Sequence, residues 1–251
     1  MSQNRIHSSK AGIIMKVDFY RHNLGLKEIA AVRKVMNSLF LTTGPVTSEF
    51  ESDFAKILRC KHAVGVTSWT MGGLITLRAL GIGPGDEVIT SPLTFISTSN
   101  IILNLGAKPV FVDVEPETGN INADLIEKAI TERTKAIVPI HLYGQMCNMK
   151  KIRAIADRHK LKVMEDCAHC IEGNRDGIRP GRLSDAAVFS FYATKNITCG
   201  EGGAIVTNRR DLAEKLVLLR SHGMSKSAAA RHVGKYQHWD MEILGYKCNM
   251  S

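Results

Sequence analysis

The chain has 251 residues, of which 44% are hydrophobic and 23% are charged, and its formal net charge is +9. This composition is ordinary for a globular protein and is enough for one large α/β domain. No apolar run approaches the roughly 20 residues that a membrane-spanning helix needs, so we expect no membrane segment. The basic residues are scattered and aromatic residues make up only 6%, which argues against a nucleic-acid partner.

The N-terminus and the cysteines favour a cytoplasmic protein. Residues 1–10 are polar and lack the apolar stretch of a secretory signal, so we expect a frayed tail there. Six cysteines occur in a chain too large to need disulfide bonds, which is typical of a reducing compartment. Cys167 and Cys170 form a C-x-x-C pair, but a second ligand pair at similar spacing is missing. We therefore expect two buried thiols and no metal site.

Short β-rich runs alternate with helical runs, which predicts βα units and an α/β fold with a mostly parallel sheet flanked by helices. The polar and basic stretch at 225–238 is expected to be a loop. Three parts result: a tail and entry segment (1–23), a large domain (24–224) and a short C-terminal segment (225–251).

The expected elements alternate along the large domain. In its first half we expect helices at 26–39, 47–58 (capped by Thr47 or Ser48), 70–80, 95–105 and 122–130, and strands at 63–66, 87–90 and 109–112. In its second half we expect strands at 136–140, 161–164, 187–191 and 204–207, and helices at 149–159 and 211–220.

Lys195 is the most informative residue of the chain. It follows the run Phe-Ser-Phe-Tyr-Ala-Thr at 189–194 and precedes the glycine-rich run at 200–203. Ser190 stands five residues before it, so a hydroxyl can meet a phosphate while the turn brings the lysine amine to an aldehyde. An amine for a Schiff base, a carboxylate for a ring nitrogen and hydroxyls for a phosphate are what pyridoxal 5'-phosphate requires. The freed amine of Lys195 would then be placed to move a proton.

The carboxylate of this set is Asp166, at the end of the strand expected at 161–164. Ligands gather at the carboxyl ends of parallel strands, and a carboxylate there favours a protonated, electron-withdrawing pyridine ring. His169 follows three residues later. Two interpretations of His169 remain open: a hydrogen-bond partner of the cofactor's ring oxygen or of substrate, and a structural histidine.

Two other strand ends carry further candidates. The helix after the strand at 63–66 opens with small and hydroxylated residues, so Thr70 could offer a hydroxyl and Met71 an amide to a phosphate. An ordinary Ser/Thr helix cap is an equally good explanation of that segment. Phe95 follows the strand at 87–90 and could stack on a flat ring, although a lone Phe is more often a core residue.

With these residues in view, the chain resembles the DegT/StrS family of nucleotide-sugar aminotransferases that depend on pyridoxal phosphate. The resemblance runs from about residue 24 to residue 251. The motifs that carry it are Thr43-Gly44-Pro45, Ser68-Trp69-Thr70, the segments 83–89 and 106–114, His141-Leu142-Tyr143-Gly144-Gln145, Glu165-Asp166 and the segment 189–203.

The resemblance implies a fold-type I transferase with a large domain around a seven-stranded sheet, a smaller C-terminal domain and a homodimer with sites at the interface. It implies that Lys195 is the Schiff-base lysine, that Asp166 pairs with the ring nitrogen and that His169 lies near the ring hydroxyl. It also implies that the phosphate is contacted by Thr70, Met71 and Ser190, and that Phe95 stacks on the ring. It places Lys247 and Asn249 in a segment that reaches the neighbouring subunit's site.

The chain departs from the family pattern at three points. Trp69 stands where many relatives have Gly or Ala, and Gly73 stands where a larger apolar residue is common. Family members usually continue well over a hundred residues further, so the C-terminal small domain is expected to be largely absent. We therefore expect the 251-residue chain alone to be poorly active.

The implied function is transfer of an amino group, from glutamate as the expected donor, to a keto-sugar nucleotide in cell-surface polysaccharide, lipopolysaccharide or amino-sugar biosynthesis. Two alternatives stay open. One is a sugar dehydratase that uses the same cofactor, which Lys195 argues against because such relatives are expected to carry histidine there. The other is a truncated, cofactor-binding or regulatory protein without turnover.

Overall fold

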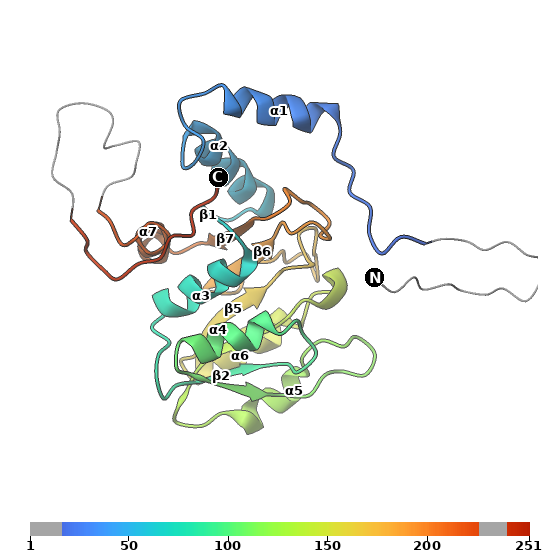
Figure 1. Cartoon of the computed structure of the whole chain (residues 1–251). Coiled ribbons are helices and arrows are strands. Elements are labelled where there is room, and N and C mark those ends of the chain that lie inside the picture. Colours follow the sequence, from blue (N-terminus) through green and yellow to red (C-terminus); the bar gives the residue numbers. More distant parts are fainter. Residues whose placement is uncertain (1–16, 226–239) are drawn as a thin grey trace, which may run out of the picture.

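Seven strands form one sheet in the order β1-β7-β6-β5-β4-β2-β3 (Figure 1). The structure is a computed structural model that describes residues 17–225 and 240–251. The strands are β1 (His62–Val66), β2 (Glu87–Thr90), β3 (Lys108–Phe111), β4 (Thr134–Val138), β5 (Lys162–Asp166), β6 (Ala186–Ser190) and β7 (Gly203–Thr207).

The sheet is parallel except at one strand. The pairs β2–β3, β2–β4, β4–β5 and β5–β6 are parallel, whereas β7 runs antiparallel to both of its neighbours, β1 and β6. The expected mostly parallel sheet is therefore confirmed. The carboxyl ends of β2, β4, β5 and β6 lie along one edge of the sheet, where a ligand site is expected.

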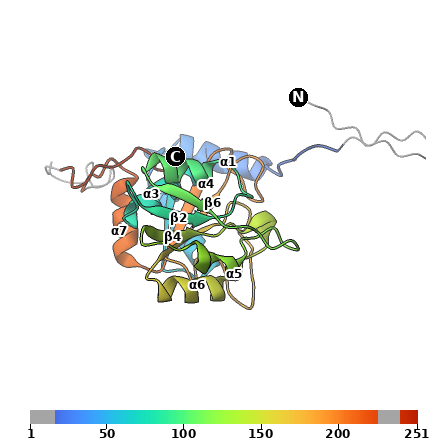
Figure 2. The same cartoon turned by 90° about the horizontal axis from the view of Figure 1, so that it is seen from below.

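Helices cover both faces of the sheet (Figure 2). One face packs against α3, α4 and α7, and the other packs against α2, α5 and α6. Strand residues alternate between the two cores: Val163 belongs to the second core and Met164 to the first. The helices are α1 (Leu26–Met36), α2 (Pro45–Leu58), α3 (Trp69–Ala79), α4 (Ser97–Asn104), α5 (Ala123–Ile126), α6 (Met149–Arg158) and α7 (Arg210–Leu219), with short 3-10 helices at Glu127–Ala129 and Leu142–Gly144.

Several expected boundaries were wrong. The helix expected at 47–58 begins at Pro45, because Gly44 is the extended N-cap and proline suits the first helical position. The helix expected at 26–39 ends at Met36, and the one expected at 95–105 begins at Ser97. The helix expected at 122–130 is a single α-turn capped by Asn122, followed by the 3-10 turn.

Trp69 and Gly73, two of the three departures noted in the sequence, lie one helical turn apart on α3. A Cβ atom at Gly73 would lie 2.7 Å from Cδ1 of Ile101 and 3.5 Å from Cη2 of Trp69. Ile101 therefore leaves no room for a side chain at Gly73, the indole lies next to the same position at ordinary contact distance, and Trp69 is 5% exposed. A residue larger than alanine at 73 would meet both Ile101 and the indole, so we expect the sizes of the residues at 69 and 73 to be coupled.

Most of the loop expected at 225–238, and the tail expected at 1–10, lie outside the described residues. Within 17–225 and 240–251, no helix has both the length and the apolar character needed to cross a bilayer.

Candidate active site

A hairpin turn between β6 and β7 carries Lys195. The antiparallel pairing continues past the end of β6, where Phe191 N–H donates to the Gly202 carbonyl at 2.9 Å. Lys195 N–H donates to the Tyr192 carbonyl at 2.9 Å, and Tyr192 N–H donates to Oγ of Ser190 at 3.3 Å. The turn therefore holds Ser190 and Lys195 at the carboxyl end of β6.

Asp166 ends β5, the neighbour of β6, and its side chain is almost completely buried. One carboxyl oxygen accepts from Oγ1 of Thr98 at 3.2 Å, and the other accepts from Ala168 N–H at 3.1 Å. Burial raises the pKa of Asp166 to about 6, although both hydrogen bonds lower it in part. Only two neutral donors bind this carboxyl group within the described residues, so a cationic partner would stabilise its charged form.

Lys195 and Asp166 influence each other's charge. Partial burial lowers the pKa of Lys195, and attraction to Asp166 opposes that effect. The field of Lys195 likewise lowers the pKa of Asp166. A lysine whose pKa is lowered has more neutral amine at a given pH, which is the form that attacks an aldehyde.

His169 lies beside Lys195 and stacks on Tyr143, with ring centroids 5.7 Å apart and an interplanar angle of 1°. Burial, and secondarily Lys195, lower the pKa of His169 and favour the neutral ring. Tyr143, His169 and Lys195 line a cavity of about 290 Å³, close to the lower end of ordinary ligand sites, about 300 Å³. Ser190, His169 and Lys195 also border one narrow space.

The structure places the other expected cofactor residues at two helix starts. Thr70 is exposed on the first turn of α3, where Ser68 is the N-cap and accepts from Met71 N–H at 3.2 Å. The Met71 amide is therefore already bonded to the cap. Phe95 lies just before α4 and is 77% exposed.

Lys247 and Asn249 lie in the C-terminal segment, beside the end of β1. Asn249 bridges to Val66, and Lys247 bridges to Ser221. The Asn249 amide donates to Oγ1 of Thr42 at 2.6 Å and its oxygen accepts from Lys247. These two residues are thus held by Thr42 in the loop before α2, by the end of β1 and by Ser221 after α7.

Thr98 and Tyr143 contact the site, and sequence reasoning gave them no role there. Thr98 belongs to α4 and shares a hydrogen bond with Thr94, one turn earlier, at 2.9 Å. Two threonines four residues apart at a helix start were a usable signal for a hydroxyl pair. Tyr143 belonged to a motif used only to identify the family. Tyr143 has a φ of 51° in a tight turn, and its ring, although 86% exposed, lies against His169. No sequence spacing indicates this contact.

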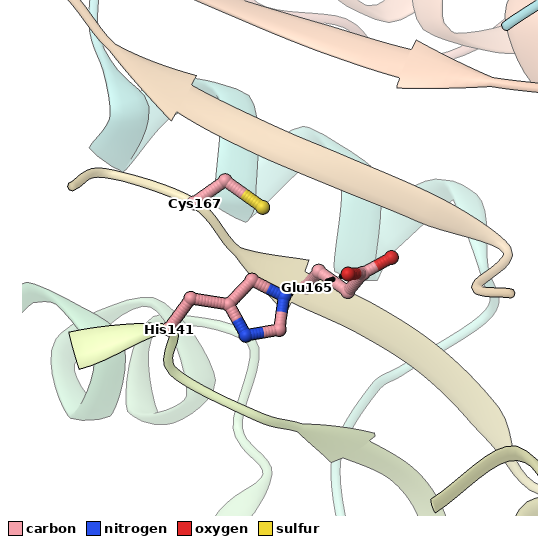
Figure 3. A group of neighbouring side chains, drawn as sticks. All are labelled: His141, Glu165 and Cys167. Carbon is pink, nitrogen blue, oxygen red and sulfur yellow. Dashed lines mark hydrogen bonds and ion pairs between the residues drawn. The ribbon is translucent and has the colours of Figure 1, made fainter. Parts of the chain in front are cut away.

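His141, Glu165 and Cys167 form a buried cluster next to Asp166 (Figure 3). Their potential ligand atoms all lie within 4.8 Å of one another. Both nitrogens of His141 are already hydrogen-bonded, to Cys147 N–H and to Glu165, and burial raises the pKa of the Cys167 thiol well above its usual value. A protonated thiol and an engaged imidazole do not favour a metal site. Cys167 and Cys170 are free, buried thiols, as expected.

A larger hollow of about 1240 Å³ lies between α2, β1 and α7. Its lining includes Glu51, Lys56, His62 and Arg220, and Glu51 and Arg220 already form an ion pair. Lys195, Asp166 and His169 are not part of that lining. The site residues expected from the sequence therefore lie at the carboxyl edge of the sheet, outside this larger hollow.

The donor set at this edge fits pyridoxal phosphate. Lys195 supplies an amine with a lowered pKa, and Asp166 supplies a buried carboxyl group that lacks a full counter-charge. Ser190 at the end of β6 supplies a hydroxyl, and the start of α3, which lies against Gly203 at the start of β7, supplies a further hydroxyl and a helix N-terminus.

Comparisons with known proteins agree with this geometry. SpsC, a spore coat polysaccharide biosynthesis protein of Bacillus subtilis, is 46% identical over 228 residues, which cover 90% of this chain and 59% of SpsC. The chain thus spans about three fifths of that curated relative. PseC of Helicobacter pylori, an aminotransferase of pseudoaminic acid biosynthesis, superposes with a TM-score of 0.85 at 33% identity and covers 93% of this chain and 61% of PseC.

NtdA of Bacillus subtilis, solved with bound pyridoxamine phosphate, superposes with a TM-score of 0.78 at 34% identity and covers 90% of this chain and 51% of NtdA. These structural neighbours are fold-type I enzymes, and pyridoxal phosphate and its amine form are the family's cofactor. The family's sequence model matches residues 23–251, and the chain belongs to the DegT/DnrJ/EryC1/StrS aminotransferase family.

Proposed function

We propose that this chain carries the catalytic residues of an aminotransferase that moves an amino group from glutamate to a keto-sugar nucleotide. The observation that supports it is the convergence of Lys195, Asp166 and His169 at one edge of the sheet. The product class is a precursor of a cell-surface polysaccharide or another amino sugar. Because the match covers 59% of SpsC, the activity must be measured on this chain itself.

Lys195 is the residue proposed to bond the cofactor aldehyde and afterwards to move protons. Its partly buried amine is biased towards the neutral form, and the carboxyl group of Asp166 lies close enough to influence its charge. Once released, Nζ holds the proton that leaves Cα of the amino donor. When bound, pyridoxal phosphate supplies the electron-accepting ring for this chemistry.

Asp166 is proposed to hold the protonated ring nitrogen. Thr98 and the Ala168 amide orient its carboxyl group, and a cationic partner would remove the cost of burying its charge. His169 is proposed to donate a hydrogen bond to the ring oxygen, with its ring orientation fixed by Tyr143.

The phosphate is proposed to lie between Ser190 and the start of α3, near Thr70 and the amide of Met71. The Ser68 cap already engages that amide, so we assign the larger share to the two hydroxyls and to the dipole of the 11-residue helix. Phe95, which is 77% exposed, is proposed to cover the ring.

We propose that the enzyme is a cytoplasmic homodimer. In this arrangement Lys247 and Asn249 reach the partner's site. The hydrogen bonds from Thr42 and β1 to this segment would present both side chains in one fixed orientation.

Absorbance spectroscopy tests the proposal. The purified chain with pyridoxal phosphate should absorb near the violet edge of the visible range, and Lys195→Ala should abolish that band. Lys150→Ala, which changes a lysine whose side chain is 61% exposed, is the matched control and should keep it. Mass spectrometry after borohydride reduction should find the label on Lys195, and a label on another lysine would refute the assignment.

Adding glutamate separates turnover from binding. Bleaching of the band, with appearance of the amine form, supports the aminotransferase. A band that persists with glutamate would favour a cofactor-binding protein without turnover. A screen of keto-sugar nucleotides, scored by consumption of the amino donor, then identifies the acceptor.

A further inference from the structure

Glu165 precedes Asp166 on β5 but faces the opposite side of the sheet. Side chains alternate along a strand, and Val163 and Cys167 belong to the core under α2, α5 and α6. Asp166 instead faces α4, where Thr98 contacts it. Glu165 is 1% exposed. A carboxylate this deeply buried is stable only if its hydrogen bonds are complete.

Three donors from two segments bind the Glu165 carboxylate. Nε2 of His141, which follows β4, lies 2.7 Å from one oxygen (Figure 3). The other oxygen accepts from Gly181 N–H at 2.8 Å and from the hydroxyl of Ser184. Gly181 and Ser184 lie in the loop that leads into β6. Glu165 therefore joins the chain after β4, the end of β5 and the entry to β6.

The hydrogen bonds of His141 fix its proton. Cys147 N–H donates to Nδ1 at 3.1 Å, so Nδ1 must carry a lone pair. The proton of the neutral ring is then on Nε2 and points to Glu165. Burial lowers the pKa of His141, but its hydrogen bonds to Cys147 and Glu165 outweigh burial and raise the pKa to about 10. Because Cys147 N–H occupies Nδ1, we infer from the geometry a neutral imidazole that donates to a carboxylate.

The backbone of the same residues continues the ladder between β4 and β5. Asp166 N–H donates to the Pro139 carbonyl at 2.9 Å, and His141 N–H donates to the Asp166 carbonyl at 3.0 Å. The His141 side chain and the His141 backbone thus hold two adjacent residues of β5. The chain then turns into Leu142–Gly144, which carries Tyr143 to His169.

We propose that Glu165 and His141 are a positioning pair: their buried hydrogen bonds fix the three segments that present Asp166, Tyr143 with His169, and the Lys195 hairpin to the cofactor. Neither residue touches the reacting atoms. The pair acts through the placement of Asp166, and this inference rests on the proposed function for its link to the cofactor.

Glu165→Gln is a sharp test because it changes one oxygen to an amide nitrogen. The new NH₂ group faces either the Nε2–H of His141 or the donors Gly181 and Ser184. If the NH₂ group faces His141, the ring can accept from it only by moving its proton to Nδ1, where that proton meets Cys147 N–H. In every arrangement, therefore, two donors face each other and one hydrogen bond is lost.

Glu87→Gln is the matched control. Glu87 is 2% exposed, accepts from Thr131 at 2.7 Å and Arg133 at 2.9 Å, and starts β2 at the end of the sheet away from the site. Both variants should lower stability to denaturant. Only Glu165→Gln should weaken binding of pyridoxal phosphate, by about tenfold or more.

Hydrogen exchange provides the readout that does not need the cofactor. In the cofactor-free protein, the Asp166 and Ala168 amides should exchange about tenfold faster in Glu165→Gln and at the wild-type rate in Glu87→Gln. Equal changes in the two variants, or unchanged Asp166 exchange in Glu165→Gln, would overturn the proposal. If the wild-type chain binds no pyridoxal phosphate, the proposed function fails while this measurement still decides the positioning role.

His141 offers a second pair of variants in case Glu165→Gln does not fold. The amide of His141→Gln can still donate to Glu165, whereas His141→Leu cannot. We expect the Asp166 amide to remain within about threefold of wild type in the glutamine variant and to exchange about tenfold faster in the leucine variant. Equal behaviour of the two would contradict the role assigned to the donor.

Discussion

Strands β4 to β6 and helix α1 have opposite environments although both are rich in aliphatic residues. Val163 and Met164 of β5 are fully buried, whereas Ile29 and Val32 of α1 are 63% and 62% exposed. No residue of α1 is buried within the described part of the chain, and Figure 1 shows the helix on the outer side of α2. The difference teaches that an apolar pattern predicts a helix or strand, but only its neighbours decide whether it contributes to stability.

The largest expected effect is in the interior. Phe189 is 1% exposed, and its ring meets that of Phe54 edge-on at 5.1 Å. Phe189→Ala should lower the free energy of unfolding by about 3–5 kcal/mol, because it removes a large buried side chain and leaves a cavity. Urea denaturation measures this. A loss similar to that of Ile29→Ala on α1 would remove the contrast between the two regions.

Asp166 makes stability depend on pH in an unusual direction. Its pKa in the folded protein is about 6, and an unfolded Asp titrates near about 3.9. The folded state binds more protons between these values, so stability without cofactor falls as pH rises through this window. Asp166→Asn should remove this loss. The difference in free energy of unfolding between Asp166→Asn and wild type should therefore shift by about 2–3 kcal/mol in favour of the variant from pH 4 to pH 8.

Denaturation at several pH values tests the effect of Asp166. Asp157→Asn, at a carboxyl group that is 68% exposed, is the control and should leave the wild-type slope unchanged. The prediction would be contradicted if wild-type stability rose between pH 4 and 6, or if Asp166→Asn and Asp157→Asn had the same dependence on pH.

Trp69 and Gly73 should show strong coupling. Gly73→Val forces a side chain against Ile101 and the indole, and we expect a loss of about 1–3 kcal/mol. Combining it with Trp69→Ala should cost less than the sum of the two single changes, because the smaller residue frees the space. Additive losses in a double-mutant cycle would show that the two positions do not compensate.

The smallest effect is expected on α1. Ile29→Ser and Val32→Ser should each change the free energy of unfolding of this chain by less than about 0.5 kcal/mol, because both side chains are already exposed. A loss above about 1 kcal/mol in urea denaturation would mean that α1 is buried in solution, for example between copies of the chain.

Sequence patterns predicted the sheet well and the boundaries of helices poorly. The strands at 63–66, 87–90 and 204–207 are close to the observed ones because buried strands are short apolar runs between clear turns. The start of α2 was misplaced because Thr47 and Ser48 looked like caps, whereas Gly44 and Pro45 begin the helix. Cap geometry depends on backbone angles that residue type only biases.

The site was predictable where neighbouring strands bring residues together. Asp166 and Ser190 end adjacent parallel strands, so their proximity follows from the strand order. Thr98 reaches Asp166 from α4, and Glu165 finds its donors after β4 and before β6. These contacts depend on how helices and loops pack over the strand ends, and no local spacing encodes that packing.

The antiparallel strand β7 has a consequence for how the chain is assembled. It pairs with β6 through a nearby hairpin but with β1 across most of the sequence, so that His62 meets Thr207. During synthesis β1 leaves the ribosome long before β7, its neighbour in the sheet, exists. We therefore expect the joining of β1 to be a slow, late event, since pairings distant in sequence form slowly. Until then the unpaired edge of β1 is a site at which the chain can aggregate.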